Sequence, residues 1–198
     1  MSEGLHRRDL VKELVKGRGA DTLFLSGLGS PCWDLNNAGD RPENFYIWGA
    51  MGGAAMIGYG VARQQPDKRV VVLTGDGEML MGMGAFATIA NHPVRNFAIV
   101  VLDNGRFGET GGQKTHTAAG VTDLAGIAKA SGITTTATIT QESEIGRLKE
   151  LVFKTPGPVV AVAKVKYEKL KFVLPANSGG YLKDRFRNAV LGEDRAQK

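Results

Sequence analysis

Two polar residues, Asp76 and Asn104, stand where runs of apolar residues end, at the carboxyl ends of two predicted strands. They are 28 positions apart, which is the length of one crossover helix and one strand. Because a right-handed crossover favours neighbouring parallel strands, we expect both side chains to emerge at the same edge of the sheet. A carboxylate and an amide oxygen, completed by a backbone oxygen and phosphate oxygens, form the oxygen shell that Mg²⁺ prefers. The spacing therefore predicts that the two residues share a magnesium ion.

Gly77, which follows Asp76, indicates that an anion is bound together with the metal ion. Gly77 opens a predicted helix, and the unpaired amide groups and positive dipole end of a helix attract an anion. Mg²⁺ is commonly bound together with phosphate groups of a ligand. The segment Gly75-Asp76-Gly77, followed by Asp103-Asn104, thus predicts a site for a metal ion and a diphosphate.

Each half of this pattern also has a simpler interpretation. Gly-Asp-Gly alone is more often a turn, and Asp-Asn after a strand is more often a loop cap, but their combination at two strand ends favours the ion site. An EF-hand is excluded because Asp76-Gly77-Glu78 lacks alternating oxygen ligands. A dinucleotide fingerprint at the earlier turn Gly27–Gly29 is poorly supported, because Cys32 stands where a third glycine would fall.

The elements that must position these residues follow from the apolar pattern. Continuous apolar runs predict strands at 22–25, 69–74, 97–102, 133–138 and 159–165. Helical spacing predicts helices at 5–16, 49–62, 78–91, 123–131, 141–154 and 180–191, with an irregular stretch through Pro42. Apolar strands separated by helices indicate an α/β fold: a doubly wound, mainly parallel sheet with helices on both faces. Ligands of such sheets bind beyond the carboxyl ends of the strands.

Composition narrows the class of protein. The chain has 198 residues, of which 42% are hydrophobic and 23% charged, so we expect one globular domain spanning 1–198. The single cysteine, Cys32, excludes an internal disulfide framework, a four-cysteine zinc site and a cysteine-ligated iron–sulfur cluster. Without a signal-peptide core or a long apolar run, we expect a cytoplasmic protein that does not bind membranes. The net charge of +5 is scattered without interleaved aromatic residues, which argues against nucleic-acid binding.

Three motifs in this chain resemble the signature of enzymes that use thiamine diphosphate. Two of them are the segments Gly75-Asp76-Gly77 and Asp103-Asn104 described above. The third lies upstream of both and is Gly49-Ala50-Met51-Gly52-Gly53-Ala54. The segment from Phe45 to Gln113 most resembles the β subunits of sulfopyruvate and phosphonopyruvate decarboxylases. A weaker resemblance continues to about Val190, so the likeness covers most of the chain and implies the thiamine diphosphate-binding fold.

The resemblance implies a role for each matching residue. The magnesium ligands would be Asp76, Asn104 and the backbone carbonyl of Arg106. The implied catalytic residues are Met51, an apolar wedge that forces the two rings of the cofactor into a V shape, and Gly49, whose carbonyl accepts a hydrogen bond from the aminopyrimidine. An unbranched methionine fits the angle between two rings. Contacts to the diphosphate are implied for Gly75, Gly77, Glu78, Gly108, Glu109 and Thr110.

Two positions depart from the family's pattern. Glu78 stands where a small residue is usual, so we expect its carboxylate either to point away from the diphosphate or to pair with a cation such as Arg106 or Lys114. Gly112 stands where the most similar relatives often have Asn. His116, on the same loop, is interpreted as a solvated side chain, with contact to a substrate acid group as the alternative.

One part of the catalytic machinery is absent from this pattern. In the family, a Glu that hydrogen-bonds the pyrimidine ring belongs to a separate pyrimidine-binding domain. We expect the diphosphate-binding domain to occupy all 198 residues, so the Glu is expected from a pyrimidine-binding α subunit. The resemblance thus implies the β subunit of a two-subunit decarboxylase that acts on a small anionic 2-oxo acid and is inactive without its partner.

Two other functions remain open at this point. The chain could belong to another thiamine diphosphate enzyme, a carboligase or an acyltransferase, or it could be a cofactor-binding module without catalysis. The cofactor motif alone does not separate the first of these from a decarboxylase. For either enzyme, we expect a hetero-oligomer in which the apolar surface from Trp48 to Gly60 forms part of the partner interface.

Overall fold

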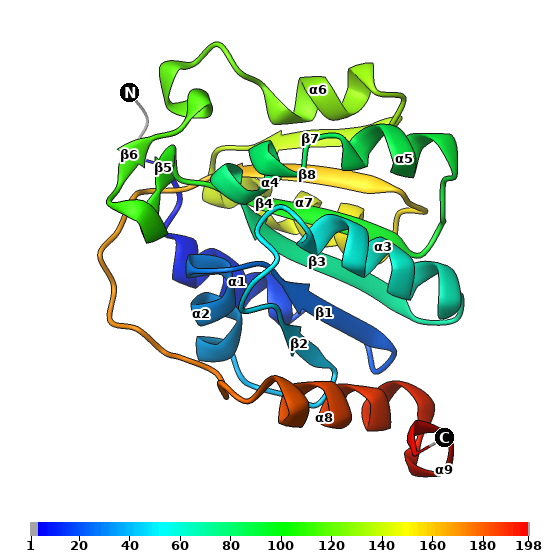
Figure 1. Cartoon of the computed structure of the whole chain (residues 1–198). Coiled ribbons are helices and arrows are strands. Elements are labelled where there is room, and N and C mark those ends of the chain that lie inside the picture. Colours follow the sequence, from blue (N-terminus) through cyan, green and yellow to red (C-terminus); the bar gives the residue numbers. More distant parts are fainter. Residues whose placement is uncertain (1–3, 198) are drawn as a thin grey trace.

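A computed structural model describes residues 4–197, so the two ends of the expected domain 1–198 lie outside the described residues. Its centre is a six-stranded sheet with the order β2-β1-β3-β4-β8-β7, in which every pairing is parallel (Figure 1). The six strands are β1 (Thr22–Ser26), β2 (Asn44–Tyr46), β3 (Arg69–Gly75), β4 (Phe97–Asp103), β7 (Thr135–Ile139) and β8 (Val159–Lys164). A separate antiparallel ribbon pairs β5 (Arg106–Phe107) with β6 (Gln113–Lys114). The predicted parallel α/β architecture is confirmed.

Helices cover both faces of the sheet (Figure 1). One face carries α1 (Arg7–Val15), α2 (Ser30–Asn37) and α7 (Ile145–Phe153). The other carries α3 (Ala54–Gln64), α4 (Asp76–Met81), α5 (Ala85–Asn91) and α6 (Leu124–Ala130). Helix α8 (Gly179–Leu191) lies along the β2 edge, and the short α9 (Glu193–Ala196) follows it.

The core explains why the strands are continuously apolar. In β3, Val70 and Val72 pack against the helices of the α3 face, whereas Val71 and Leu73 pack against those of the α1 face. All four side chains are fully buried. Successive side chains of a strand point to opposite faces, so a sheet covered on both sides needs apolar residues at every position.

The stretch predicted to be irregular through Pro42 holds helix α2, and strand β2 follows shortly after Pro42. Helix α2 begins at Ser30 with Pro31 in its first turn, a position where proline is well accommodated. Strand β2 has three residues and pairs only with β1, at the edge of the sheet. Helix α2 has weak apolar periodicity because its buried positions include Asp34, which is paired with Arg7.

Two predicted helices are shortened or divided at turns that contain glycine. The helix predicted at 49–62 begins only at Ala54, because Ala50 and Gly52 have φ angles of 52° and 81°. The helix predicted at 78–91 is divided into α4 and α5, with Gly82 as the C-cap of α4. A Cβ atom on Gly82 would lie 2.0 Å from the carbonyl oxygen of Gly52, so the two backbones touch at this point.

The remaining predicted elements differ only at their ends. Helix α1 starts two residues later than predicted, since Leu5 instead forms an isolated parallel bridge with Val165. Strand β7 is shifted to 135–139 by its pairing with β8, and α7 is preceded by a 3-10 turn at 142–144. Among residues 4–197, no helix has the length and apolar character that crossing a membrane requires.

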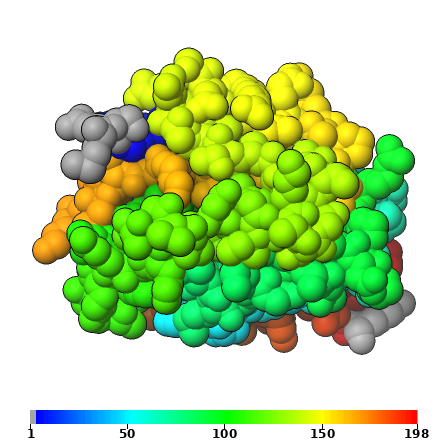
Figure 2. Space-filling model, turned by 90° about the horizontal axis from the view of Figure 1, so that it is seen from above, coloured from blue at the N-terminus to red at the C-terminus, as the bar shows by residue number. Residues whose placement is uncertain are grey.

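After β8, residues 166–178 form an extended segment, here called the C-terminal strap. It lies on α2, where the Trp33 and Phe172 rings are 4.3 Å apart between centroids and Asn36 donates a hydrogen bond to the Val173 carbonyl at 3.1 Å. Figure 2 shows its first part, in orange, beside the green loop that follows β4. The Arg106 guanidinium of that loop lies 5.7 Å from the Tyr167 ring centroid of the strap.

Candidate functional site

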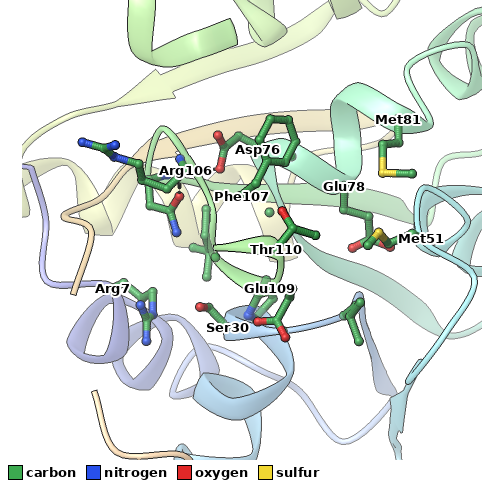
Figure 3. Close-up of a pocket in the computed structure, with 18 residues that line it drawn as sticks. Arg7, Ser30, Met51, Asp76, Glu78, Met81, Arg106, Phe107, Glu109 and Thr110 are labelled. Atoms are coloured by element: carbon green, nitrogen blue, oxygen red, sulfur yellow. Dashed lines mark hydrogen bonds between the residues drawn. The ribbon is translucent and has the colours of Figure 1, made fainter. Parts of the chain in front are cut away.

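A cavity opens at the carboxyl ends of β1, β3 and β4 (Figure 3). Its wall contains ten of the eleven residues selected from the sequence: Met51, Gly75, Asp76, Gly77, Glu78, Asn104, Arg106, Gly108, Glu109 and Thr110. The eleventh, Gly49, does not line this cavity. Segments far apart in the sequence thus converge because parallel strands present their carboxyl ends on one side of the sheet.

Asp76 and Asn104 lie together, as their spacing predicts. Strands β3 and β4 are paired in parallel, with Gly75 opposite Leu102. The backbone N–H of Asn104 donates a hydrogen bond to Asp76 Oδ1 at 3.3 Å. Asp76 is 1% exposed. Burial raises the pKa of Asp76, and the nearby Asp103 carboxylate raises it further, while the Thr115 hydroxyl opposes the shift. A divalent cation beside Asp76 would supply the positive charge needed to balance this buried carboxylate.

The donor atoms around this point suit a hard cation. Asn104 Oδ1 accepts a hydrogen bond from the Arg106 amide at 2.8 Å, which holds the side-chain oxygen beside the Arg106 backbone. The Arg106 guanidinium is directed elsewhere, donating to the Gly112 carbonyl at 3.2 Å. No cluster of three His, Cys, Asp or Glu side chains exists within residues 4–197 that could hold a metal alone. One carboxylate, one amide oxygen and one carbonyl oxygen fit Mg²⁺ that is also bound by phosphates.

Glu78 points away from the cations that the sequence offers it. Thr74 Oγ1 donates a hydrogen bond to Glu78 Oε2 at 2.6 Å, and the residue is 8% exposed. A Cβ atom on Gly27 would lie 1.6 Å from Oε2, so the carboxylate fills the space beside that glycine. In Figure 3 the Glu78 side chain extends toward Met51, on the opposite side from the Arg106 side chain. The alternative in which Glu78 pairs with Arg106 or Lys114 is therefore not the arrangement in the structure.

The surroundings of Glu78 favour its neutral form. Burial raises the pKa of Glu78, although the Thr74 hydroxyl and the backbone amides of Ala54, Gly52 and Leu28 oppose the shift. Oε1 is buried and has no hydrogen-bond partner among the described residues, so one oxygen of this carboxyl group is left without a close donor.

Glu109 lies on the opposite side of the same glycine turn. It belongs to the 3-10 turn Gly108–Thr110, and its side chain reaches the start of α2 beside Ser30 (Figure 3). A Cβ atom on Gly29 would lie 2.6 Å from Glu109 Oε1. Partial burial raises the pKa of Glu109. Two carboxylates, Glu78 and Glu109, therefore flank the turn from Gly27 to Gly29.

Met51 forms part of the cavity wall on a strained turn. Ala50 has a φ of 52°, a conformation uncommon for a residue with a side chain. Met51 follows it, lines the cavity and is 42% exposed. Gly52 then packs on Gly82, so the contact between the two glycine backbones fixes the height of the turn above α4. The side chain is thus presented on a rigid support.

The first turn of α2 also belongs to the site, although the predicted site residues do not include it. Leu28, Gly29, Ser30 and Pro31 all line the cavity, and Arg7 of α1 lines it as well. The signal for this part of the site is the glycine turn at the end of the strand predicted at 22–25. His116, by contrast, is exposed and does not line this cavity.

Comparison with known proteins identifies the family to which this site belongs. Residues 34–163 match the family "Thiamine pyrophosphate enzyme, C-terminal TPP binding domain", named after the alternative term for thiamine diphosphate. The chain belongs to this family. Over 161 residues it is 36% identical to the sulfopyruvate decarboxylase subunit beta of Methanocaldococcus jannaschii, covering 81% of this chain and 85% of that subunit.

Other members of the thiamine pyrophosphate family are longer than this chain. The phosphonopyruvate decarboxylase of Streptomyces viridochromogenes is 37% identical over 140 residues, covering 71% of this chain and 34% of that enzyme. A solved structure of a putative thiamin diphosphate-dependent enzyme from Mycobacterium smegmatis superposes with a TM-score of 0.71 at 22% identity, covering 83% of this chain. The chain spans about a third (32%) of that structure's length. This likeness supports the shared fold.

Proposed function

We propose that this chain is the cofactor-binding β subunit of a two-subunit 2-oxo acid decarboxylase, acting with thiamine diphosphate and Mg²⁺. The observation that carries the proposal is the convergence of Asp76, Asn104 and the Arg106 backbone on one wall of a cavity that Met51 also lines. Relatives named sulfopyruvate decarboxylase subunit beta support the reaction and the division into subunits.

The residues of the chain divide the work of holding the cofactor. Asp76, Asn104 and the Arg106 carbonyl hold the metal ion, and backbone groups at Gly75, Gly77, Glu78 and the Gly108–Thr110 turn contact the diphosphate. The first turn of α2 adds amide groups and the Ser30 hydroxyl on the facing wall. When bound, thiamine diphosphate supplies the electron sink that decarboxylation of a 2-oxo acid requires.

Met51 and Gly49 act at the other end of the cofactor. Met51 supports the angle between the two rings, and the Gly49 carbonyl orients the aminopyrimidine. Gly49 lies outside the wall of the cavity, next to Ala50 with its positive φ. The contact of its carbonyl with the aminopyrimidine is therefore assigned to the part of the site beyond this wall. Neither role requires a charged side chain.

The carboxylate that activates the pyrimidine comes from a second chain, a pyrimidine-binding α subunit. The two glutamates of the cavity are unsuited to that role, because Glu78 is held by Thr74 and Glu109 faces the start of α2. An exposed apolar surface beside Met51 offers the interface, here called the methionine patch. Its members, with their exposed fractions, are Met51 (42%), Met56 (36%), Ile57 (37%), Met81 (60%) and Met83 (37%). Exposed apolar surface of this kind is typical of interaction sites.

The assignment is tested by reconstitution. The purified chain is expected to release no CO₂ from sulfopyruvate or phosphonopyruvate, and addition of a candidate pyrimidine-domain subunit is expected to start release. The matched control is a partner in which the Glu that contacts the pyrimidine is changed to Gln. The assembly with this partner is expected to remain inactive. Vigorous decarboxylation by this chain alone would show that the missing carboxylate lies within it. We expect the assembly to be a cytoplasmic hetero-oligomer.

A further inference from the structure

The loop that follows β4 folds back over Asp76 and brings two buried threonines to it. Thr115 and Thr117, at the start of the short 3-10 helix η2 (His116–Ala119), are 3% and 6% exposed. Thr115 Oγ1 lies 2.5 Å from Asp76 Oδ2 and 2.9 Å from Thr117 Oγ1. Thr117 Oγ1 lies 2.7 Å from Asp103 Oδ1 and 3.2 Å from Asp76 Oδ2.

Each threonine hydroxyl has one proton, and this limits which of the contacts are hydrogen bonds. A hydroxyl group donates only one hydrogen bond. The shortest contacts therefore give the Thr115 proton to Asp76 Oδ2 and the Thr117 proton to Asp103 Oδ1. No proton is then left for the contact between the two hydroxyls, which lie 2.9 Å apart. Thr117, held by Asp103, therefore acts only as a brace packed against Thr115, while Thr115 is the group that holds Asp76.

Asp103 anchors this arrangement through both of its carboxylate oxygens. Its Oδ1 also accepts a hydrogen bond from the Gly105 amide at 3.2 Å, and its Oδ2 is paired with Lys164 of β8. Asp103 is 4% exposed and does not line the cavity. It therefore connects the threonines to the sheet and is not available as a metal ligand.

The two oxygens of Asp76 are consequently in different situations. Oδ2 accepts the short hydrogen bond from Thr115 and faces Thr117 as well. Within residues 4–197, Oδ1 accepts one hydrogen bond, the longer one from the backbone N–H of Asn104 at 3.3 Å, and it lies on the side of the second proposed ligand. A carboxylate oxygen has two acceptor positions, so Oδ1 retains one.

We infer that Thr115 is a positioning residue that fixes Asp76 through Oδ2, so that Oδ1 is the oxygen presented to the divalent cation, with Thr117 as its brace. This inference rests on the proposed function, in which Asp76 is a metal ligand. Groups that orient metal ligands commonly contribute about 10- to 100-fold to metal affinity.

The test is a calorimetric titration of the full chain with Mg²⁺ and, separately, Ca²⁺, at a fixed concentration of thiamine diphosphate. Thr115→Val removes the donor while keeping the shape, and is expected to weaken Mg²⁺ binding by about 10- to 100-fold. Ca²⁺ binding is expected to weaken less, because Ca²⁺ tolerates irregular geometry whereas Mg²⁺ demands a near-ideal octahedron. Thr115→Ser restores the hydroxyl and is expected to restore Mg²⁺ affinity.

Two further variants keep the test decisive. Thr138→Val, at an exposed threonine of β7, is the matched control and is expected to leave both affinities unchanged. Thr117→Val removes the hydrogen bond that anchors the brace to Asp103, and is expected to weaken Mg²⁺ binding less than Thr115→Val does. If Thr115→Val does not fold, the Thr117→Val variant tests the inference instead. Unchanged Mg²⁺ affinity in Thr117→Val would then overturn it.

The outcomes separate this inference from the function on which it rests. If Asp76→Asn abolishes Mg²⁺ binding but Thr115→Val leaves it unchanged, the positioning role is wrong and the metal assignment stands. Equal losses for Mg²⁺ and Ca²⁺ in Thr115→Val would also overturn the role, because they would indicate general damage to the loop. If Asp76→Asn retains full Mg²⁺ affinity, the metal assignment itself fails, and the inference fails with it.

Discussion

The backbones of Gly52 and Gly82 are in direct contact. A Cβ atom on Gly82 would lie 2.0 Å from the Gly52 carbonyl oxygen, a distance that no side chain can occupy. This contact joins the turn that carries Met51 to the point where α4 ends. The position of an apolar side chain in the cavity wall therefore depends on a glycine that does not itself line the cavity.

Gly82→Ala is expected to destabilise the protein by about 1–3 kcal/mol, the usual cost of forcing extra atoms into a packed site. It should also displace the Met51 turn and so lower the turnover of the reconstituted enzyme. Unfolding in urea measures the first effect. The control is Gly60→Ala in α3, where a Cβ atom meets nothing within 4 Å. A Gly82→Ala protein as stable as the Gly60→Ala protein would contradict the packing argument.

Asp76→Ala and Asn104→Ala are each expected to weaken Mg²⁺-dependent binding of thiamine diphosphate by at least about 100-fold, since each removes a proposed ligand. Both residues follow strand ends and neither belongs to the apolar core, so circular dichroism should show an intact fold. Calorimetric titration with the cofactor, with and without Mg²⁺, provides the measurement. Unchanged affinity in both variants would remove the metal assignment.

Met51→Ala is expected to leave cofactor affinity nearly unchanged and to lower kcat by about 10- to 100-fold, the usual penalty for misplaced reacting groups. The physical reason is that Met51 acts on the angle between the rings and not on the diphosphate. Val121→Ala removes an exposed apolar side chain that belongs neither to the cavity wall nor to the methionine patch, and serves as the control. A fall in affinity without a change in kcat would show that the wedge role is wrong.

Glu78→Gln is expected to alter how stability depends on pH. Burial raises the pKa of Glu78 above its ordinary value of 4.5, so the unfolded chain releases this proton at lower pH than the folded chain does. The contribution of Glu78 to stability is therefore complete below pH 4.5 and is lost as pH rises through the raised pKa. The neutral Gln escapes this loss, so the variant should gain stability over the native protein as pH rises.

Urea unfolding at pH 4 and pH 8 measures this difference, and Glu142→Gln, at an exposed glutamate, provides the control. The Thr74 hydrogen bond can be kept by the amide oxygen of Gln, so packing around Gly27 is preserved. An equal effect of Glu78→Gln at both pH values would show that the carboxyl group does not change its ionisation on folding.

Glu109→Ser is expected to tighten binding of thiamine diphosphate by about 5- to 30-fold, which corresponds to roughly 1–2 kcal/mol of removed repulsion. The Glu109 carboxylate lies against Gly29 at the start of α2, on the wall proposed to face the diphosphate. Because repulsion between charges is screened by salt, the gain should shrink at high ionic strength. Calorimetry at two salt concentrations, with Glu142→Ser as control, tests both points, and weaker binding by Glu109→Ser would show that Glu109 assists the cofactor.

Most of the architecture was determined by the sequence itself. The apolar runs of β3 and β4 can be satisfied only by a sheet covered on both faces, and the spacing of Asp76 and Asn104 sets them at adjacent strand ends. Such features are local in the chain or follow from the handedness of the crossover. The pattern therefore identified the edge of the sheet at which the site lies. The single domain over 1–198 stays a prediction.

The tertiary structure decided what depends on contacts between distant segments. The sequence left the partner of the Glu78 carboxylate open, and packing against Gly27 and Thr74 decided it. Helix α2 escaped detection because Asp34 is buried there through its pairing with Arg7, 27 positions away. The Thr115 contact with Asp76 spans 39 positions and depends on how the loop folds back. Periodicity carries no signal for such pairs, because their energy arises only when the sheet has already brought the segments together.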